Sequence, residues 1–123
     1  MGAQIVDVVG DLVTCKVWGT LTQTELATIQ LDASGIMQAR GSIRLLVIVE
    51  SFQGWERGEW ENYSFQAQND AKIESMAVVG EQRWEELTEA FVGKGLREFP
   101  IEYFAPAELG QALRWLAREA SSP

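Results

Sequence analysis

Histidine is absent from this 123-residue chain, and cysteine occurs once, as Cys15. Without histidine, Ser-His and Cys-His nucleophile pairs, His-ligated metal sites and the commonest general base are excluded. A single cysteine forms neither an intramolecular disulfide nor a thiolate zinc site. The sequence also has no Walker loop and no GxGxxG fingerprint. It therefore predicts a protein that is not an enzyme and that uses no cofactor or metal.

Basic residues and long apolar runs are scarce too. Ten Lys and Arg stand against 18 Asp and Glu, giving a net charge of −8. Binding to a phosphate backbone needs clustered Lys and Arg, so we expect no nucleic acid partner. No apolar run approaches the roughly 20 residues of a membrane-spanning helix, and the start of the chain lacks the features of a secretory signal. We expect a cytoplasmic protein.

The composition that remains is that of a globular domain. Apolar residues make up 46% of the chain and charged residues 23%, which is enough to form one hydrophobic core. We expect a single domain over residues 1–120 and a frayed tail at 121–123.

Periodicity and turn signals predict the order of the elements. Ile5–Val9 and Leu12–Trp18 form a hairpin around a Gly10-Asp11 turn, and Thr22 caps a helix running to Ala39. The further elements expected are a strand buried on both faces, a helix, a strand, a helix, an edge strand and a last helix: Leu45–Val49, Glu59–Gln68, Ile73–Val79, Glu81–Phe91, Phe99–Tyr103 and the segment from Pro106. This order predicts an α/β fold with a mixed sheet, an N-terminal hairpin and about four helices.

Aromatic residues gather directly after the buried strand. In Arg44–Tyr63 we expect a loop and a helix that carry Phe52, Trp55, Trp60 and Tyr63. In open α/β sheets, ligands bind beyond the carboxyl ends of the strands. The rings form either a core seal between helix and sheet or the lining of a pocket or membrane-facing patch. Tyr103 joins them if its side of the sheet faces the helix.

Two other features carry weaker hypotheses. Ser51 directly follows the buried strand and is a candidate modification site. Glutamates cluster at Glu56, Glu59 and Glu61, and again along Glu81–Phe91. Paired acids perform acid/base chemistry if one is buried beside an aromatic ring, and they are otherwise a solvated helix face.

An ordered set of short motifs resembles a known family. The motifs are Trp18-Gly19, the Thr-led first helix, Arg44-Leu45-Leu46-Val47, Phe52-Gln53-Gly54-Trp55, Ala77-Val78-Val79-Gly80 and Ala112-Leu113-Arg114-Trp115-Leu116. Together they are similar to the bacterial SpoIIAA-like proteins, which are relatives of the STAS domains and of the anti-sigma-factor antagonists. The resemblance implies a STAS-like fold and a non-enzymatic module.

The resemblance also bears on mechanism. STAS switches keep an Asp-Ser-Ser-Gly motif, with a phosphorylated serine, at the start of the second helix. Here Trp55-Glu56-Arg57-Gly58 occupies that place, so the glycine is kept and the phosphoacceptor is lost. In the SpoIIAA-like branch, a mobile second helix over an apolar cavity implies a lipid-like ligand or a membrane surface.

Two hypotheses follow. The leading one is a binding module whose second helix, Glu59–Gln68, covers a pocket near the strand ends at Val49 and Val79. Its ligand is small, apolar and lipid-like, or it is a membrane surface. The rival is a protein-interaction module of the anti-sigma-factor-antagonist kind, regulated at Ser51. The oligomeric state is left open, a homodimer included.

Overall fold

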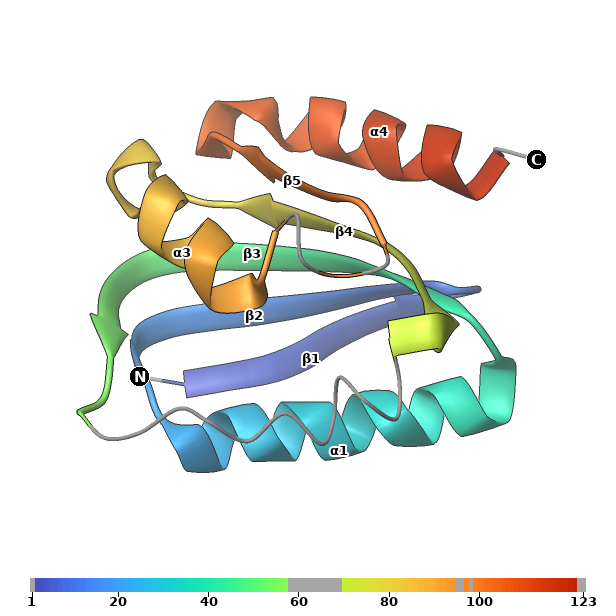
Figure 1. Ribbon diagram of the computed structural model, residues 1–123, viewed down its shortest axis with the longest axis horizontal. Helices are drawn as coiled ribbons and strands as arrows, with labels where there is room; N and C mark the ends of the chain where they lie inside the picture. Colours follow the sequence, from blue (N-terminus) through green and yellow to red (C-terminus); the bar gives the residue numbers. More distant parts are fainter. Residues whose placement is uncertain (1, 58–69, 95–96, 98, 122–123) are drawn as a thin grey trace.

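The computed structural model describes residues 2–57, 70–94, 97 and 99–121 (Figure 1). Its centre is one five-stranded sheet in the order β1-β2-β3-β4-β5. The strands are β1 Gly2–Val9, β2 Leu12–Leu21, β3 Ile43–Trp55, β4 Ile73–Val79 and β5 Ile101–Phe104. The first pair is antiparallel and the other pairs are parallel, which is the mixed sheet expected from the sequence.

The N-terminal hairpin forms where the turn signal predicts it. Val9 pairs with Leu12 across Gly10 and Asp11, and Gly10 takes the left-handed φ of +61° that favours glycine. The guanidinium of Arg44 binds the Asp11 carboxylate at 2.6 Å and also donates to the Leu116 carbonyl oxygen at 3.3 Å. This arginine therefore ties the hairpin turn to the C-terminal helix.

The first helix begins at the predicted cap. α1, Gln23–Arg40, has Thr22 as its N-cap, and the Glu25 carboxylate accepts from the Thr22 amide at 3.0 Å in a capping box. Ala33 and Met37 are its buried residues.

The sheet has a different helix layer on each face. On one face, α1 and α3 (Glu85–Val92) cover a core that includes Val13, Leu45 and Met76. On the other face, α4 (Leu109–Ser121) packs on β3, β4 and β5 through a smaller cluster. Figure 1 shows α1 and α4 on opposite sides of the sheet. β3 contributes to both clusters, so the prediction of a strand buried on both faces is confirmed.

The prediction of a loop directly after Val49 is wrong. β3 continues to Trp55, and its ladder with β2 is interrupted after Trp18 and again after Gly19. Trp18 pairs with Glu50, Gly19 with Phe52 and Thr20 with Gly54, which leaves Ser51 and Gln53 as extra residues of two bulges. The continuous apolar run Leu45–Val49 stops there, and nothing in the residues that follow indicates a strand that continues through bulges.

The helices differ from the expectation in number and in detail. The described part of the chain holds three α-helices rather than about four, and the expected helix at Glu59–Gln68 lies outside that part. The expected helix at Glu81–Phe91 is a short 3₁₀ segment, Gln82–Trp84, followed by α3. On α4, Leu109 and Leu113 are exposed rather than core residues, whereas Ala112 and Leu116 are fully buried against the sheet.

The edges of the sheet are β1 and β5, as Pro100 indicates for the last strand. None of the described helices is long and apolar enough to cross a bilayer.

Candidate functional site

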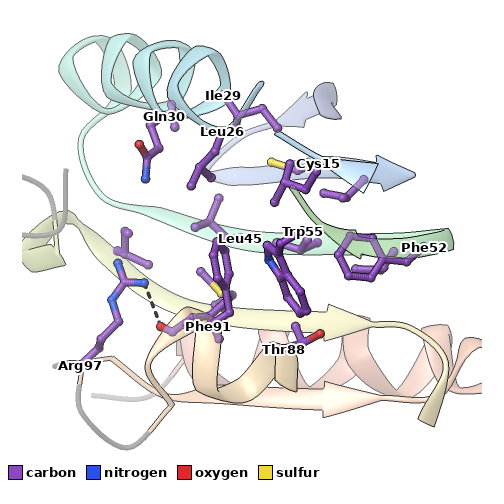
Figure 2. Close-up of a pocket in the computed structure, with 18 residues that line it drawn as sticks. Cys15, Leu26, Ile29, Gln30, Leu45, Phe52, Trp55, Thr88, Phe91 and Arg97 are labelled. Atoms are coloured by element: carbon purple, nitrogen blue, oxygen red, sulfur yellow. Dashed lines mark hydrogen bonds between the residues drawn. The ribbon is translucent and has the colours of Figure 1, made fainter. Parts of the chain in front are cut away.

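A cavity of about 160 Å³ lies between α1, α3 and the sheet (Figure 2). The strands contribute Cys15, Val17, Leu21, Leu45, Val47, Val49, Phe52, Trp55, Ile73 and Met76. The helices contribute Leu26, Ile29, Gln30, Ala33, Thr88, Phe91 and Val92, and Arg97 completes the described wall. Nearly all of these side chains are apolar, as in the lining of most small-molecule pockets.

Four aromatic rings form a cluster at one end of the cavity. Phe52 makes edge contacts at 5.0 Å with both Trp55 and Trp84, and Trp55 lies 5.2 Å from Phe91. Edge-to-face pairs at these distances are favourable, by about 0.5–1.5 kcal/mol each. The cluster joins the end of β3 to α3.

The bulges of β3 direct these rings into the cavity. Side chains of a regular strand alternate between faces, so residues three apart face opposite sides. Val49, Phe52 and Trp55 are each three apart, yet all of them line the cavity. One extra residue in each interval, Ser51 and then Gln53, restores the parity.

Two polar groups in the cavity wall are buried without a partner. Among the residues that the structure describes, nothing hydrogen-bonds to Thr88 Oγ1 or Trp55 Nε1. Thr88 retains only 7% of its exposure. A buried group without a partner costs about 1–3 kcal/mol. The mostly apolar wall therefore contains two polar atoms, one on α3 and one on β3, that have no partner among the described residues.

A polar end lies opposite the aromatic cluster. Figure 2 shows Gln30 of α1 and Arg97 at the end of the cavity away from Phe52, with their polar groups directed toward the space between them. Arg97 donates to the Val92 carbonyl oxygen at 3.1 Å, and its guanidinium lies 4.6 Å from the centre of the Phe99 ring. Among the described lining residues, Arg97 is the single charged one.

Cys15 lies in the floor of the cavity and is buried. Burial raises the pKa of this thiol from 9.0 to about 12. The thiol is therefore protonated at neutral pH, which argues against a nucleophilic role and agrees with a core residue.

Of the residues predicted for the site, two line the cavity and the others do not or lie outside the described residues. Phe52 and Trp55 line the cavity, whereas Trp60 and Tyr63 lie outside the described residues. Tyr103 is not among the described lining residues, and its hydroxyl donates to the Glu81 carbonyl oxygen at 2.8 Å. Burial raises the pKa of Tyr103 to about 12. Ser51 is exposed, with a left-handed φ of 47°.

Several lining residues were not expected as site residues. Thr88 and Phe91 lie in the helix expected at Glu81–Phe91, where a threonine between Trp84 and Phe91 on the apolar face signals a polar group that faces inward. No sequence signal pointed to Arg97 or Gln30, which reach the cavity only through the tertiary fold. Among the described residues no glutamate is buried, and no cluster of three potential metal ligands occurs.

Comparison with known proteins shows which family the chain belongs to. Residues 12–117 match the model of the SpoIIAA-like family. Comparison with curated proteins gives no match. A solved structure of an uncharacterised protein with a SpoIIAA-like fold, from Shewanella loihica, superposes with a TM-score of 0.73 over 94% of each chain at 16% identity. At that identity the likeness concerns the fold, whereas the family match spans most of the sequence: the chain belongs to the SpoIIAA-like family.

Proposed function

We propose that this protein is a non-enzymatic STAS-type module of the cytoplasm that binds a small apolar ligand in the cavity between α1, α3 and the sheet. The observation that carries the proposal is the cavity itself, about 160 Å³ with almost wholly apolar walls. Close-packed cores contain few voids larger than a water molecule, so a space of this size is unusual in a purely structural core.

The size of the cavity narrows the lipid-like ligand that the family resemblance implies. A cavity of about 150 Å³ lined by apolar side chains stays dry and holds a molecule the size of benzene. The space here is similar, so it suits a ring or a short chain rather than a whole long acyl chain. A long-chain lipid or a membrane surface would need the walls to move apart.

The proposal is tested by native mass spectrometry after mild extraction, together with tryptophan fluorescence during titration with small apolar compounds. Trp55 lies in the wall, so a bound molecule changes its emission. Ala33→Leu fills the cavity from α1, whereas Ala27→Leu adds the same side chain on the exposed side of that helix. We expect binding in the wild type and in Ala27→Leu and none in Ala33→Leu. Absence of binding in the wild type would refute the proposal.

One observation keeps the rival function open. Ser51 is exposed and stands as the extra residue of a bulge, so its hydroxyl is accessible to a modifying partner. As a second candidate we propose a protein-interaction module regulated at this serine. A pull-down with the wild type and with Ser51→Glu tests it. A stable partner that one of the two loses supports this function, and equal recovery by both contradicts regulation at Ser51.

A further inference from the structure

We propose that residues 81–92, the short 3₁₀ segment together with α3, form a lid that moves away from the sheet as one unit and gives access to the cavity. We name this segment the α3 lid. The inference goes beyond the proposed function, because it concerns access to the cavity and needs no ligand. Its test also uses no ligand, so the two proposals fail independently.

Polar atoms without a partner concentrate where the α3 lid meets the sheet. In the described part of the chain, four side-chain polar atoms are buried with no hydrogen-bond partner. Trp84 Nε1 and Thr88 Oγ1 belong to the lid, and Trp55 Nε1 belongs to the end of β3, with its ring 6.0 Å from that of Trp84. Each of these donors regains a hydrogen bond with water when the lid moves away. The closed position is therefore opposed by three donors at one contact.

Aromatic contacts hold the α3 lid closed. The Trp84 ring lies 5.0 Å from that of Phe52, and the Phe91 ring lies 5.2 Å from that of Trp55. All eight residues of α3 are described, and Thr88 alone among them is buried. A helix this short has little stability of its own in water. Its position therefore depends on tertiary contacts, and the one side chain it buries brings an unpartnered hydroxyl.

The two ends of the α3 lid suit a hinged movement. At its start, the Tyr103 hydroxyl donates to the Glu81 carbonyl oxygen at 2.8 Å, in an exposed contact. Directly after its end, Gly93 has a left-handed φ of +76°, a conformation that glycine adopts without strain. Lys94 Nζ then lies 3.8 Å from the Glu102 carboxylate of β5, which anchors the chain beyond the glycine. A hydrogen bond that water can replace closes one end, and a permissive joint forms the other.

The helix on the other side of the cavity is a poorer candidate for the moving part. α1 has 18 residues, a complete capping box and two buried apolar residues, Ala33 and Met37. None of the unpartnered polar atoms in the described chain belongs to α1. Moving α1 would expose apolar surface to water and satisfy none of these donors.

The reaction of Cys15 with a thiol reagent measures the opening. Cys15 and Thr88 line the same cavity, from β2 and from α3 (Figure 2). At low reagent concentration, the lid closes faster than the thiol reacts, so the rate reports the population of the open state. Opening of the lid alone exposes little surface, so we expect a rate that hardly changes at low urea concentration. A rate that rises from zero urea with the slope of global unfolding would overturn the proposal.

Two variants that remove unpartnered hydroxyls isolate the α3 lid. Thr88→Val removes one from the lid, and Ser75→Ala removes the fourth unpartnered atom, on β4. Ser75 lies two residues before Ala77 of the α4 cluster, so it faces the side of the sheet opposite the cavity. We expect Cys15 to react about 5-fold more slowly in Thr88→Val, because the closed state loses an unsatisfied donor. In Ser75→Ala the rate without urea should equal that of the wild type.

Tyr103→Phe acts in the opposite direction. It removes the hydrogen bond to the Glu81 carbonyl oxygen and keeps the ring, so we expect Cys15 to react about 5-fold faster without urea. Unchanged rates in both Thr88→Val and Tyr103→Phe would overturn the lid, and so would equal slowing by Thr88→Val and Ser75→Ala. These results leave the binding of apolar compounds to its own test.

Discussion

Val47 of β3 and Val78 of β4 are register partners on the same face of the sheet, yet only Val47 lines the cavity. Val78 retains 1% of its exposure and is enclosed by its neighbours. The boundary between a filled core and an open space therefore runs between these two side chains. The same substitution on its two sides measures what the space contributes.

Val47→Ile is expected to stabilise the protein by about 0.8 kcal/mol, because the added methylene enters the cavity and is removed from water. Val78→Ile is expected to destabilise it by about 1–3 kcal/mol, because the same methylene has no room. Urea unfolding of both variants measures the difference. Equal effects of the two substitutions would mean that the space beside Val47 is not open.

Gly80→Ala is expected to lower the free energy of unfolding by about 1–3 kcal/mol. A Cβ atom at this position would lie 2.6 Å from the Tyr103 hydroxyl oxygen and 3.2 Å from Val49 Cβ. The tyrosine would have to move and lose its hydrogen bond to the Glu81 carbonyl oxygen.

Gly35→Ala is the control for that substitution. Gly35 lies within α1, and no neighbouring atom of the described chain stands within 4 Å of an added Cβ. Alanine stabilises a helix interior by about 1 kcal/mol relative to glycine. Thermal unfolding should therefore show shifts of opposite sign for the two variants. A stabilised Gly80→Ala would contradict the packing described.

Thr88→Val is expected to stabilise the protein by about 1 kcal/mol, because the hydroxyl lost has no partner among the described residues. Valine has nearly the same shape, so the apolar wall is kept. Thr28→Val is a matched control on α1, where the exposed hydroxyl donates to the Thr24 carbonyl oxygen at 3.0 Å. Its effect should stay within about 0.5 kcal/mol. Denaturant titration measures the free energy of unfolding of both variants. Marked destabilisation by Thr88→Val would reveal a partner for the hydroxyl.

Cys15 is expected to react with a thiol reagent at least about 100-fold more slowly in the native protein than in denaturant, because the thiol is buried and protonated. Since burial raises its pKa from 9.0 to about 12, stability is retained below pH 9.0 and falls as the pH rises toward 12. The absorbance of the released thiol product gives the rates. Fast native labelling would show that the cavity opens readily.

Asp11→Asn is expected to change how the free energy of unfolding depends on pH in the acid range. The hydrogen bond from Arg44 holds the pKa of Asp11 below its ordinary value of 3.8. The lowered pKa stabilises the fold above pH 3.8, and this contribution is lost as the pH falls through the lowered pKa. Because the pair is partly exposed, the difference at neutral pH should be about 1 kcal/mol or less. Unfolding curves of wild type and variant should converge at low pH.

Local signals predicted most of the fold. The Gly10-Asp11 turn, the Thr22 capping box and the apolar run of β4 depend on residues close together in sequence, and the structure has all of them. The resemblance to SpoIIAA-like proteins is confirmed by the match over residues 12–117. Short-range patterns of this kind need no knowledge of which segments meet.

The candidate site was less predictable than the fold, because it depends on contacts between residues far apart in the sequence. Phe52 and Trp55 were expected in a loop, either as a core seal or as the lining of a pocket, because the bulges that place them on β3 leave no simple periodicity. Gln30, Thr88 and Arg97 come from different parts of the chain and line one cavity only after α1 and α3 pack on the same face of the sheet. Their polar side chains look like ordinary helix and loop residues until the tertiary contacts are known.

The bulges of β3 also divide that strand mechanically. From Arg44 to Ile48 it is held by β2 and β4 on its two sides, whereas from Val49 to Trp55 its described ladder is with β2 alone. Bending stiffness is therefore lower in the part of the strand that carries the aromatic rings. A force on Phe52 or Trp55 bends the end of the strand and leaves the doubly paired part in register. The part of the cavity wall formed by Phe52 and Trp55 is thus more compliant than the sheet that supports it.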